Sequence, residues 1–67
     1  MDNDIEFRAK VAAFVRRNGL SDTRFGLLVS KDAHLYGRVM RGATRRPTNL
    51  RIARFMQLYE LQHESAA

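Results

Sequence analysis

The sequence predicts an all-α fold, a compact four-helix domain that fills residues 1–67. Apolar residues recur at intervals of three and four along most of the chain, and no segment keeps the alternation of a strand. The glycines and the single proline lie mostly between these periodic stretches, where they end helices. A chain of 67 residues without cysteine has room for one small core and forms no disulfide. The helices are expected over residues 4–17, 22–29, 33–41 and 49–62.

The first helix has one apolar face and a clear end. Its apolar residues follow the spacing of a single buried stripe, and they are Phe7, Val11, Phe14 and Val15. Gly19 follows the last periodic residue, which is the usual place of a left-handed terminator. The stretch 4–17 therefore reads as a helix that packs on the core along one side.

The second helix is short and begins with a capping residue. Ser21 is a good N-cap, and the expected inward side chains are Phe25, Leu28 and Val29. Gly26 lies inside the helix, where glycine costs about 1 kcal/mol relative to alanine. We interpret this glycine as a place where another helix approaches closely.

The third helix lies in the stretch "SKDAHLYGRVMRG", residues 30–42. Asp32 is its expected N-cap and Gly42 its terminator. At 100° per residue the apolar side chains cluster on one side, and they are Leu35, Tyr36, Val39 and Met40. The opposite side carries His34, Gly37, Arg38 and Arg41. Together with the second helix and the link "SKD", this helix has the layout of a helix-turn-helix.

The polar side of this third helix has two interpretations. A solvated face would favour strong helix formers such as Glu, Lys and Ala, yet this face holds a glycine between cations and no acid. Gly37 leaves room for a partner near the backbone, and arginine matches the O6 and N7 acceptors of guanine. The alternative is an ordinary surface helix with exposed arginines. The composition favours a face that touches a partner.

The fourth helix offers both a core stripe and a second apolar face. Thr48 is its expected N-cap, and its core stripe consists of Ile52, Phe55, Met56 and Tyr59. The second face consists of Leu50, Gln57, Leu58 and Leu61. We interpret it as a candidate dimer interface, with the alternative that Leu50 and Leu61 only cover the ends of the core.

The charges of the chain indicate a polyanionic partner. Lysines and arginines total 12 against 7 acids, and ten of the twelve are arginines. Between Thr23 and Tyr59 the only acid is Asp32. Such a basic segment suits nucleic acid, and its alternative is a solvated basic surface that keeps the protein soluble.

The segment "SDTRFGLLVSKDAHLYGRVMRGATRRPTNLRIARFM" resembles the Cro and phage-repressor type of helix-turn-helix domain. The shared features are a Ser cap, an apolar and a small residue in the second helix (Phe25 and Gly26), an "x-R-G" end to the third helix, and a basic loop with proline before a further helix. Two residues depart from the family pattern, because the turn usually holds a glycine and an apolar residue where this chain has Ser30 and Lys31. The conformation of the turn, and the first residue of the third helix, can therefore differ from the family.

The resemblance implies roles for individual residues. The third helix would enter the major groove, where the residues that meet base edges would be Ala33, His34, Gly37, Arg38 and Arg41. Those that meet phosphates would be Thr23, Arg24, Arg45, Arg46, Thr48 and Asn49. Lys31 is expected to face solvent or phosphate, since a buried unpaired lysine is costly.

The expected function is that of a sequence-specific, double-stranded DNA-binding regulator of transcription. The resemblance suggests a repressor or Cro-like protein of a phage, mobile element or bacterium. Because one recognition helix reads too few base pairs for high specificity, we expect a homodimer on a palindromic operator, located in the cytoplasm, at the nucleoid. No membrane is expected, because the longest strongly apolar run, Leu27 to Val29, is far too short to span one, and the acidic start "MDNDIEF" lacks the apolar run of a signal peptide. No cofactor, metal or small-molecule ligand is expected either, since His34 and His63 form no ligand pattern.

Other functions remain open. The same fold can serve as a protein-binding module, such as an antitoxin or antirepressor. RNA binding is disfavoured because single-strand readers present aromatic platforms, whereas the aromatic residues here are needed for the core. An enzyme is not expected, since the sequence has no paired carboxylates and no nucleophile–base arrangement.

Overall fold

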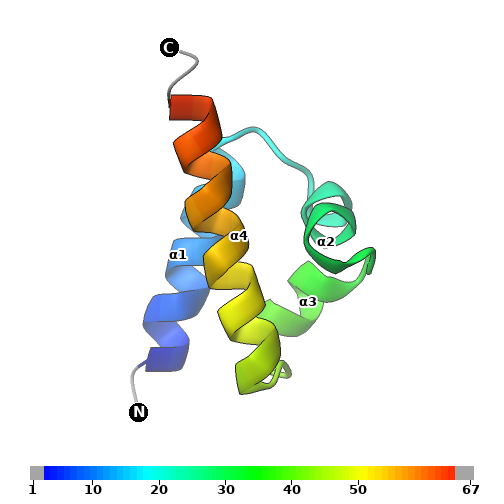
Figure 1. Ribbon diagram of the computed structural model, residues 1–67. Helices are drawn as coiled ribbons and strands as arrows, with labels where there is room; N and C mark the ends of the chain where they lie inside the picture. Colours follow the sequence, from blue (N-terminus) through cyan, green and yellow to red (C-terminus); the bar gives the residue numbers. More distant parts are fainter. Residues whose placement is uncertain (1–2, 65–67) are drawn as a thin grey trace.

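The computed structural model describes residues 3–64, and in this part of the chain it is a compact all-helical domain. It contains four helices and no strand: α1 (Asn3–Arg17), α2 (Asp22–Ser30), α3 (Leu35–Met40) and α4 (Arg46–Glu64). α1 and α4 lie side by side, and α2 and α3 form a pair beside them (Figure 1). The all-α fold class is thus confirmed. Within residues 3–64, no helix combines the length and the apolar character that crossing a bilayer requires.

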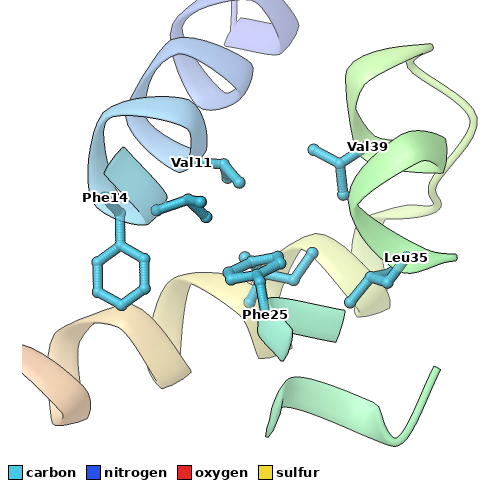
Figure 2. Close-up of a cluster of buried hydrophobic side chains, with 7 residues drawn as sticks. Val11, Phe14, Phe25, Leu35 and Val39 are labelled. Carbon is cyan, nitrogen blue, oxygen red and sulfur yellow. The ribbon is translucent and has the colours of Figure 1, made fainter. Parts of the chain in front are cut away.

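All four helices contribute to one core. The buried side chains meet between α1, α4 and the α2–α3 pair (Figure 2), and they are Val11, Phe14, Val15, Phe25, Leu35, Val39 and Ile52. Phe14 lies at the centre of an aromatic cluster, with its ring centroid 6.2 Å from that of Phe25, 5.9 Å from Phe55 and 5.4 Å from Tyr59. These pairs have the edge-on geometry that aromatic rings prefer. The core therefore fixes α2 and α3 against α1 and α4.

The first two helices follow the expected boundaries within one residue. α1 begins at Asn3, one residue before the expected start, and Gly19 ends it with φ +66°. α2 runs one residue further than expected, to Ser30, and the Ser21 hydroxyl oxygen accepts a hydrogen bond from the Arg24 N–H at 3.0 Å. The expected N-cap of α2 is confirmed.

Leu28 does not point inward as expected, because its side chain is 42% exposed. Phe25 and Gly26 are buried and Val29 is half-buried. At 100° per residue these three lie within an arc of about 100°, and Leu28 lies outside it. The packed side of α2 is therefore narrower than the apolar pattern suggests.

α3 is shorter than the expected 33–41, because it begins at Leu35 and ends at Met40. Asp32 is not its N-cap. The Asp32 carboxylate accepts a hydrogen bond from the His34 N–H at 2.9 Å, and the Asp32 carbonyl accepts one from the Leu35 N–H at 3.1 Å. These bonds form a turn ahead of the helix, so Ala33 and His34 lie in the turn. Gly42 ends the segment with φ +72°, as expected.

α4 is longer than the expected 49–62, because it begins at Arg46 and continues to Glu64. Thr48 therefore lies in the first turn and is not the N-cap. Pro47 is tolerated here, since the first N–H groups of a helix have no intrahelical partner. The Thr44 hydroxyl instead donates a hydrogen bond to Asn49 Oδ1 at 2.6 Å, which ties the preceding loop to the helix.

Candidate nucleic-acid interface

The turn between α2 and α3 is built around a left-handed residue. Lys31 has φ +59° and ψ +32°, a conformation that residues other than glycine seldom adopt. Its N–H bonds to the Leu27 carbonyl at 3.1 Å, and the next N–H, of Asp32, bonds to the Gly26 carbonyl at 3.2 Å. The chain thus reverses immediately after α2. The side chain of Lys31 is exposed, as expected.

Gly26 brings this turn against the backbone of α2. A Cβ built on Gly26 would lie 2.0 Å from the Asp32 carbonyl oxygen and 3.3 Å from Leu35 Cβ. The close approach predicted from this glycine exists, but it is made mainly by the backbone of the turn, not by a helix. It fixes the start of α3 relative to α2.

α3 has a buried side and an open side. Leu35 and Val39 are buried, and the Tyr36 ring lies edge-on to Phe25 with a centroid distance of 6.0 Å. On the other side, His34 directly before the helix and Arg41 directly after it are exposed. A Cβ on Gly37 would meet only Arg41 Nη1, at 3.6 Å. The predicted division of the helix is therefore present, and its outward side leaves room beside Gly37.

Ala33 and Arg38, the other two residues expected to meet base edges, are not simply exposed. Ala33 is half-buried in the turn before α3. Arg38 forms an ion pair with Asp32, with Arg38 Nη2 2.5 Å from Asp32 Oδ2, and the two side chains are 42% and 28% exposed. The His34 N–H, and then the Arg38 guanidinium, hold the pKa of the Asp32 carboxyl below its usual value.

This ion pair was not expected from the sequence, which predicts a capping role for Asp32 and a base contact for an exposed Arg38. The available signal was that Asp32 is the only acid between Thr23 and Tyr59. An acid that is alone in a basic segment is expected to form an ion pair with whichever arginine the fold places close to it.

The expected phosphate-contacting residues lie at three helix ends or turns. Thr23 and Arg24 are exposed in the first turn of α2, and Lys31 is exposed in the turn before α3. Arg45 and Arg46 are exposed at the start of α4, where Thr48 and Asn49 are half-buried. A helix N-terminus favours phosphate through its free N–H groups. Asp22 is an exposed acid in the first turn of α2, and the sequence interpretation gave it no part.

Arg8 is a structural residue that the sequence interpretation missed. Its Nη1 donates a hydrogen bond to the Met40 carbonyl at 2.9 Å. The bond satisfies one carbonyl at the end of α3, where a helix leaves such groups without partners. It joins α1 to the last turn of α3 across 32 positions of the chain, a separation at which no local pattern in the sequence marks the pairing.

The candidate dimer interface of α4 is accessible in the single chain. Leu50 is 63% exposed, Leu58 49% and Leu61 56%, and Gln57 is exposed as well. At 100° per residue Leu50, Gln57 and Leu61 lie on the side of α4 opposite Ile52 and Tyr59. Leu50 and Leu61 therefore add little to the cover of the core.

Among the described residues, no group of three or more His, Cys, Asp and Glu side chains is placed to hold a metal ion. Comparison of the chain with protein-family models, curated proteins and solved structures gave no match.

Proposed function

We propose that this chain is a small regulator of transcription that binds double-stranded DNA in a sequence-specific way. The observation that carries the proposal is α3, whose buried Leu35 and Val39 anchor one side. Gly37 and Arg38 occupy the other side, and Arg41 follows directly after the last residue of the helix. The turn and the Arg8 hydrogen bond hold the two ends of this helix. A short, anchored helix with an open basic side suits the major groove.

The contacts divide by chemistry. Arg38 and Arg41 would meet guanine, and His34 and Ala33 would approach bases from the turn at the N-terminal end of α3. Gly37 would let the α3 backbone come close to the base edges. The exposed cations at the helix ends (Arg24, Lys31, Arg45 and Arg46), with Thr23, Thr48 and Asn49, would hold phosphates and set the register on the duplex.

The proposed regulator acts as a homodimer on a palindromic operator. One α3 reads too few base pairs for high specificity, and a dimer places two such helices about 34 Å apart. The α4 face of Leu50, Gln57, Leu58 and Leu61 supplies an accessible apolar surface for this contact. By occupying the operator in the cytoplasm, at the nucleoid, the protein would exclude other proteins, as in the Cro-like domains that it resembles. It would need no cofactor or small-molecule ligand.

A second candidate function is binding of a partner protein, as by an antitoxin or antirepressor of this fold. Leu27 and Leu28 favour it, because these two side chains of α2 are 48% and 42% exposed and lie next to each other. The basic outward side of α3 favours DNA.

Selection of bound duplexes from a random DNA pool tests the proposal. The expected result is enrichment of a palindrome whose half-sites contain guanine, followed by binding of that sequence at least about a thousand-fold tighter than random DNA. A pool that remains random after repeated rounds would contradict sequence-specific binding. If the chain instead binds a protein encoded by a neighbouring gene and enriches no DNA sequence, the second candidate would be favoured.

A further inference from the structure

Asp32 connects the turn to the outward side of α3. Its Oδ1 accepts the His34 N–H at 2.9 Å, and its Oδ2 lies 2.5 Å from Arg38 Nη2. One carboxylate therefore contacts both a backbone group of the turn and a side chain assigned to base reading. No other acid occurs between Thr23 and Tyr59.

The ion pair places the Arg38 guanidinium at the N-terminal end of α3. Side chains on a helix tilt toward its N-terminus, and Asp32 precedes the first helical residue, Leu35. The guanidinium is thus held beside His34 and the turn. Helix-turn-helix proteins make their base contacts mainly with this end of the recognition helix.

The paired guanidinium can still read a base. Arginine has five N–H donors, and the Asp32 carboxylate engages the Nη2 side of the group. Donors remain for two acceptors such as O6 and N7 of guanine. Because the guanine edge carries no net charge, it can approach a guanidinium that already has a carboxylate partner.

A phosphate is treated differently by the same pair. The carboxylate cancels the net charge of Arg38 and repels an anion that approaches it. The pair therefore disfavours the use of Arg38 as a phosphate contact more than it disfavours contact with guanine. This difference between a correct and an incorrect ligand is a source of specificity.

We propose that Asp32 is a positioning residue that determines specificity: it holds Arg38 toward guanine and keeps it from binding phosphate in random DNA. This inference rests on the proposed function, since it needs a duplex as ligand. The Asp32 carboxylate thereby raises the discrimination between operator and random DNA and lowers the affinity for random DNA.

Asp32→Asn is the variant that isolates the charge. The amide oxygen can still accept the His34 N–H, so the turn keeps its hydrogen bond while the ion pair loses its charge. Dissociation constants are measured at one salt concentration for the selected operator and for a random duplex of equal length. The set of proteins is the wild type, Asp32→Asn, Arg38→Ala and the double variant, each with its helical circular dichroism.

The expected result is a change in the ratio of the two constants. Asp32→Asn should bind random DNA about two- to five-fold more tightly, the size of effect of a partly exposed ion pair, and its discrimination should fall about ten-fold. In the Arg38→Ala background the same substitution should leave the ratio unchanged, because the residue it positions is absent. If Asp32→Asn loses helical structure, Asp32→Ser replaces it, since a serine hydroxyl can serve in such a turn without charge.

Two results would overturn the inference alone. The first is a wild type that binds the operator specifically together with an Asp32→Asn variant that discriminates between operator and random DNA equally well. The other is an equal loss of discrimination with and without Arg38, which would show that Asp32 acts only through the turn. A wild type that binds no duplex would refute the proposed function and the inference with it.

Discussion

Arg38 and Arg46 have the same side chain in different surroundings, and the proposed function gives them different tasks. Arg38 lies on the outward side of α3 in its ion pair, and Arg46 is exposed at the first residue of α4. Arg38→Ala should cost about 1–3 kcal/mol per half-site on the operator and little on random DNA, because it removes a base contact. Arg46→Ala should weaken both DNAs alike and reduce the salt dependence by about one phosphate contact. Binding titrations with both duplexes measure this difference.

Both variants should keep the fold, so melting curves provide the control. Arg46 is exposed, and the Arg38 ion pair is partly open to solvent, where such pairs contribute little to stability. If Arg38→Ala weakens operator and random DNA equally, Arg38 does not read a base. If it unfolds the protein, the outward side of α3 is structural.

The ion pair also predicts how stability responds to acid. The His34 N–H and the Arg38 guanidinium lower the pKa of the Asp32 carboxyl in the folded chain, and the unfolded chain lacks both contacts. A lowered folded pKa gives stability that is present above the unfolded pKa and is lost as the pH falls through the folded pKa. The difference in free energy of unfolding between wild type and Asp32→Asn should be present above about pH 5 and shrink below about pH 4. Urea denaturation across this range measures it, and a difference that grows on acidification would contradict the assignment.

Two glycines, one in α2 and one in α3, should respond to alanine in opposite ways. A Cβ at Gly26 would lie 2.0 Å from the Asp32 carbonyl oxygen, a backbone atom that cannot move without moving the turn. Gly26→Ala should therefore destabilise the fold by about 1–3 kcal/mol. A Cβ at Gly37 would meet only the mobile end of Arg41, at 3.6 Å. Gly37→Ala should stabilise the fold by about 0.5–1 kcal/mol, since alanine favours helix.

Urea denaturation of the two variants under the same conditions tests this pair. Gly37→Ala should also weaken binding of the operator, because its methyl group occupies the space beside α3 that a base edge would need. Equal destabilisation by the two substitutions would mean that the space beside Gly37 is filled in the folded protein. Unchanged operator binding by Gly37→Ala would remove the role given to this glycine.

The positions of the helices could be predicted from the sequence better than their ends. Apolar spacing decides which side of a helix is buried, and this information is local. The start of α3 depends instead on the hydrogen bonds of Asp32, which form a turn where a cap was expected. The start of α4 depends on the conformation of the preceding loop, which Pro47 and the Thr44–Asn49 hydrogen bond fix. These competing local bonds have similar energies, so composition alone does not choose between them.

The candidate site follows the same rule. The buried and outward sides of α3 could be predicted because they follow from its helical period. The Asp32–Arg38 pair and the Arg8–Met40 hydrogen bond could not, because each needs the conformation of a turn or the packing of α1 against α3. For α3, the sequence thus predicts which side faces outward, and tertiary packing decides which side chains on it already have a partner in the protein.

At the scale of the whole molecule, the net charge of +5 predicts a binding affinity that depends on salt. Each phosphate that the protein neutralises releases counterions, with a slope of about −0.9 in a log–log plot of affinity against salt. About four to eight contacts for a dimer would give a total slope of roughly −4 to −7. Fluorescence anisotropy of a labelled operator over a salt series measures this slope. A flat response would count against binding of a duplex, whatever the sequence.

The same slope depends on assembly, because a dimer presents the basic residues of two chains. The α4 face of Leu50, Gln57, Leu58 and Leu61 should bury its leucines in this dimer, and a charge placed there would have to be desolvated. Leu61→Glu should therefore convert the dimer to a monomer while keeping its helical circular dichroism. Ile5→Glu is the matched control, since it makes the same change of charge at a residue of α1 that is 63% exposed, close to the 56% of Leu61.

Light scattering over a concentration series, with and without operator, separates the outcomes. A monomeric Leu61→Glu should bind a half-site nearly as well as one wild-type subunit does, yet lose the preference for a palindrome, because no contact then fixes the spacing of two α3 helices. Ile5→Glu should keep both the dimer and that preference. A wild type that stays monomeric at high concentration and on DNA contradicts the dimer. Equal disruption by the two variants would mean that added negative charge, and not the α4 face, controls assembly.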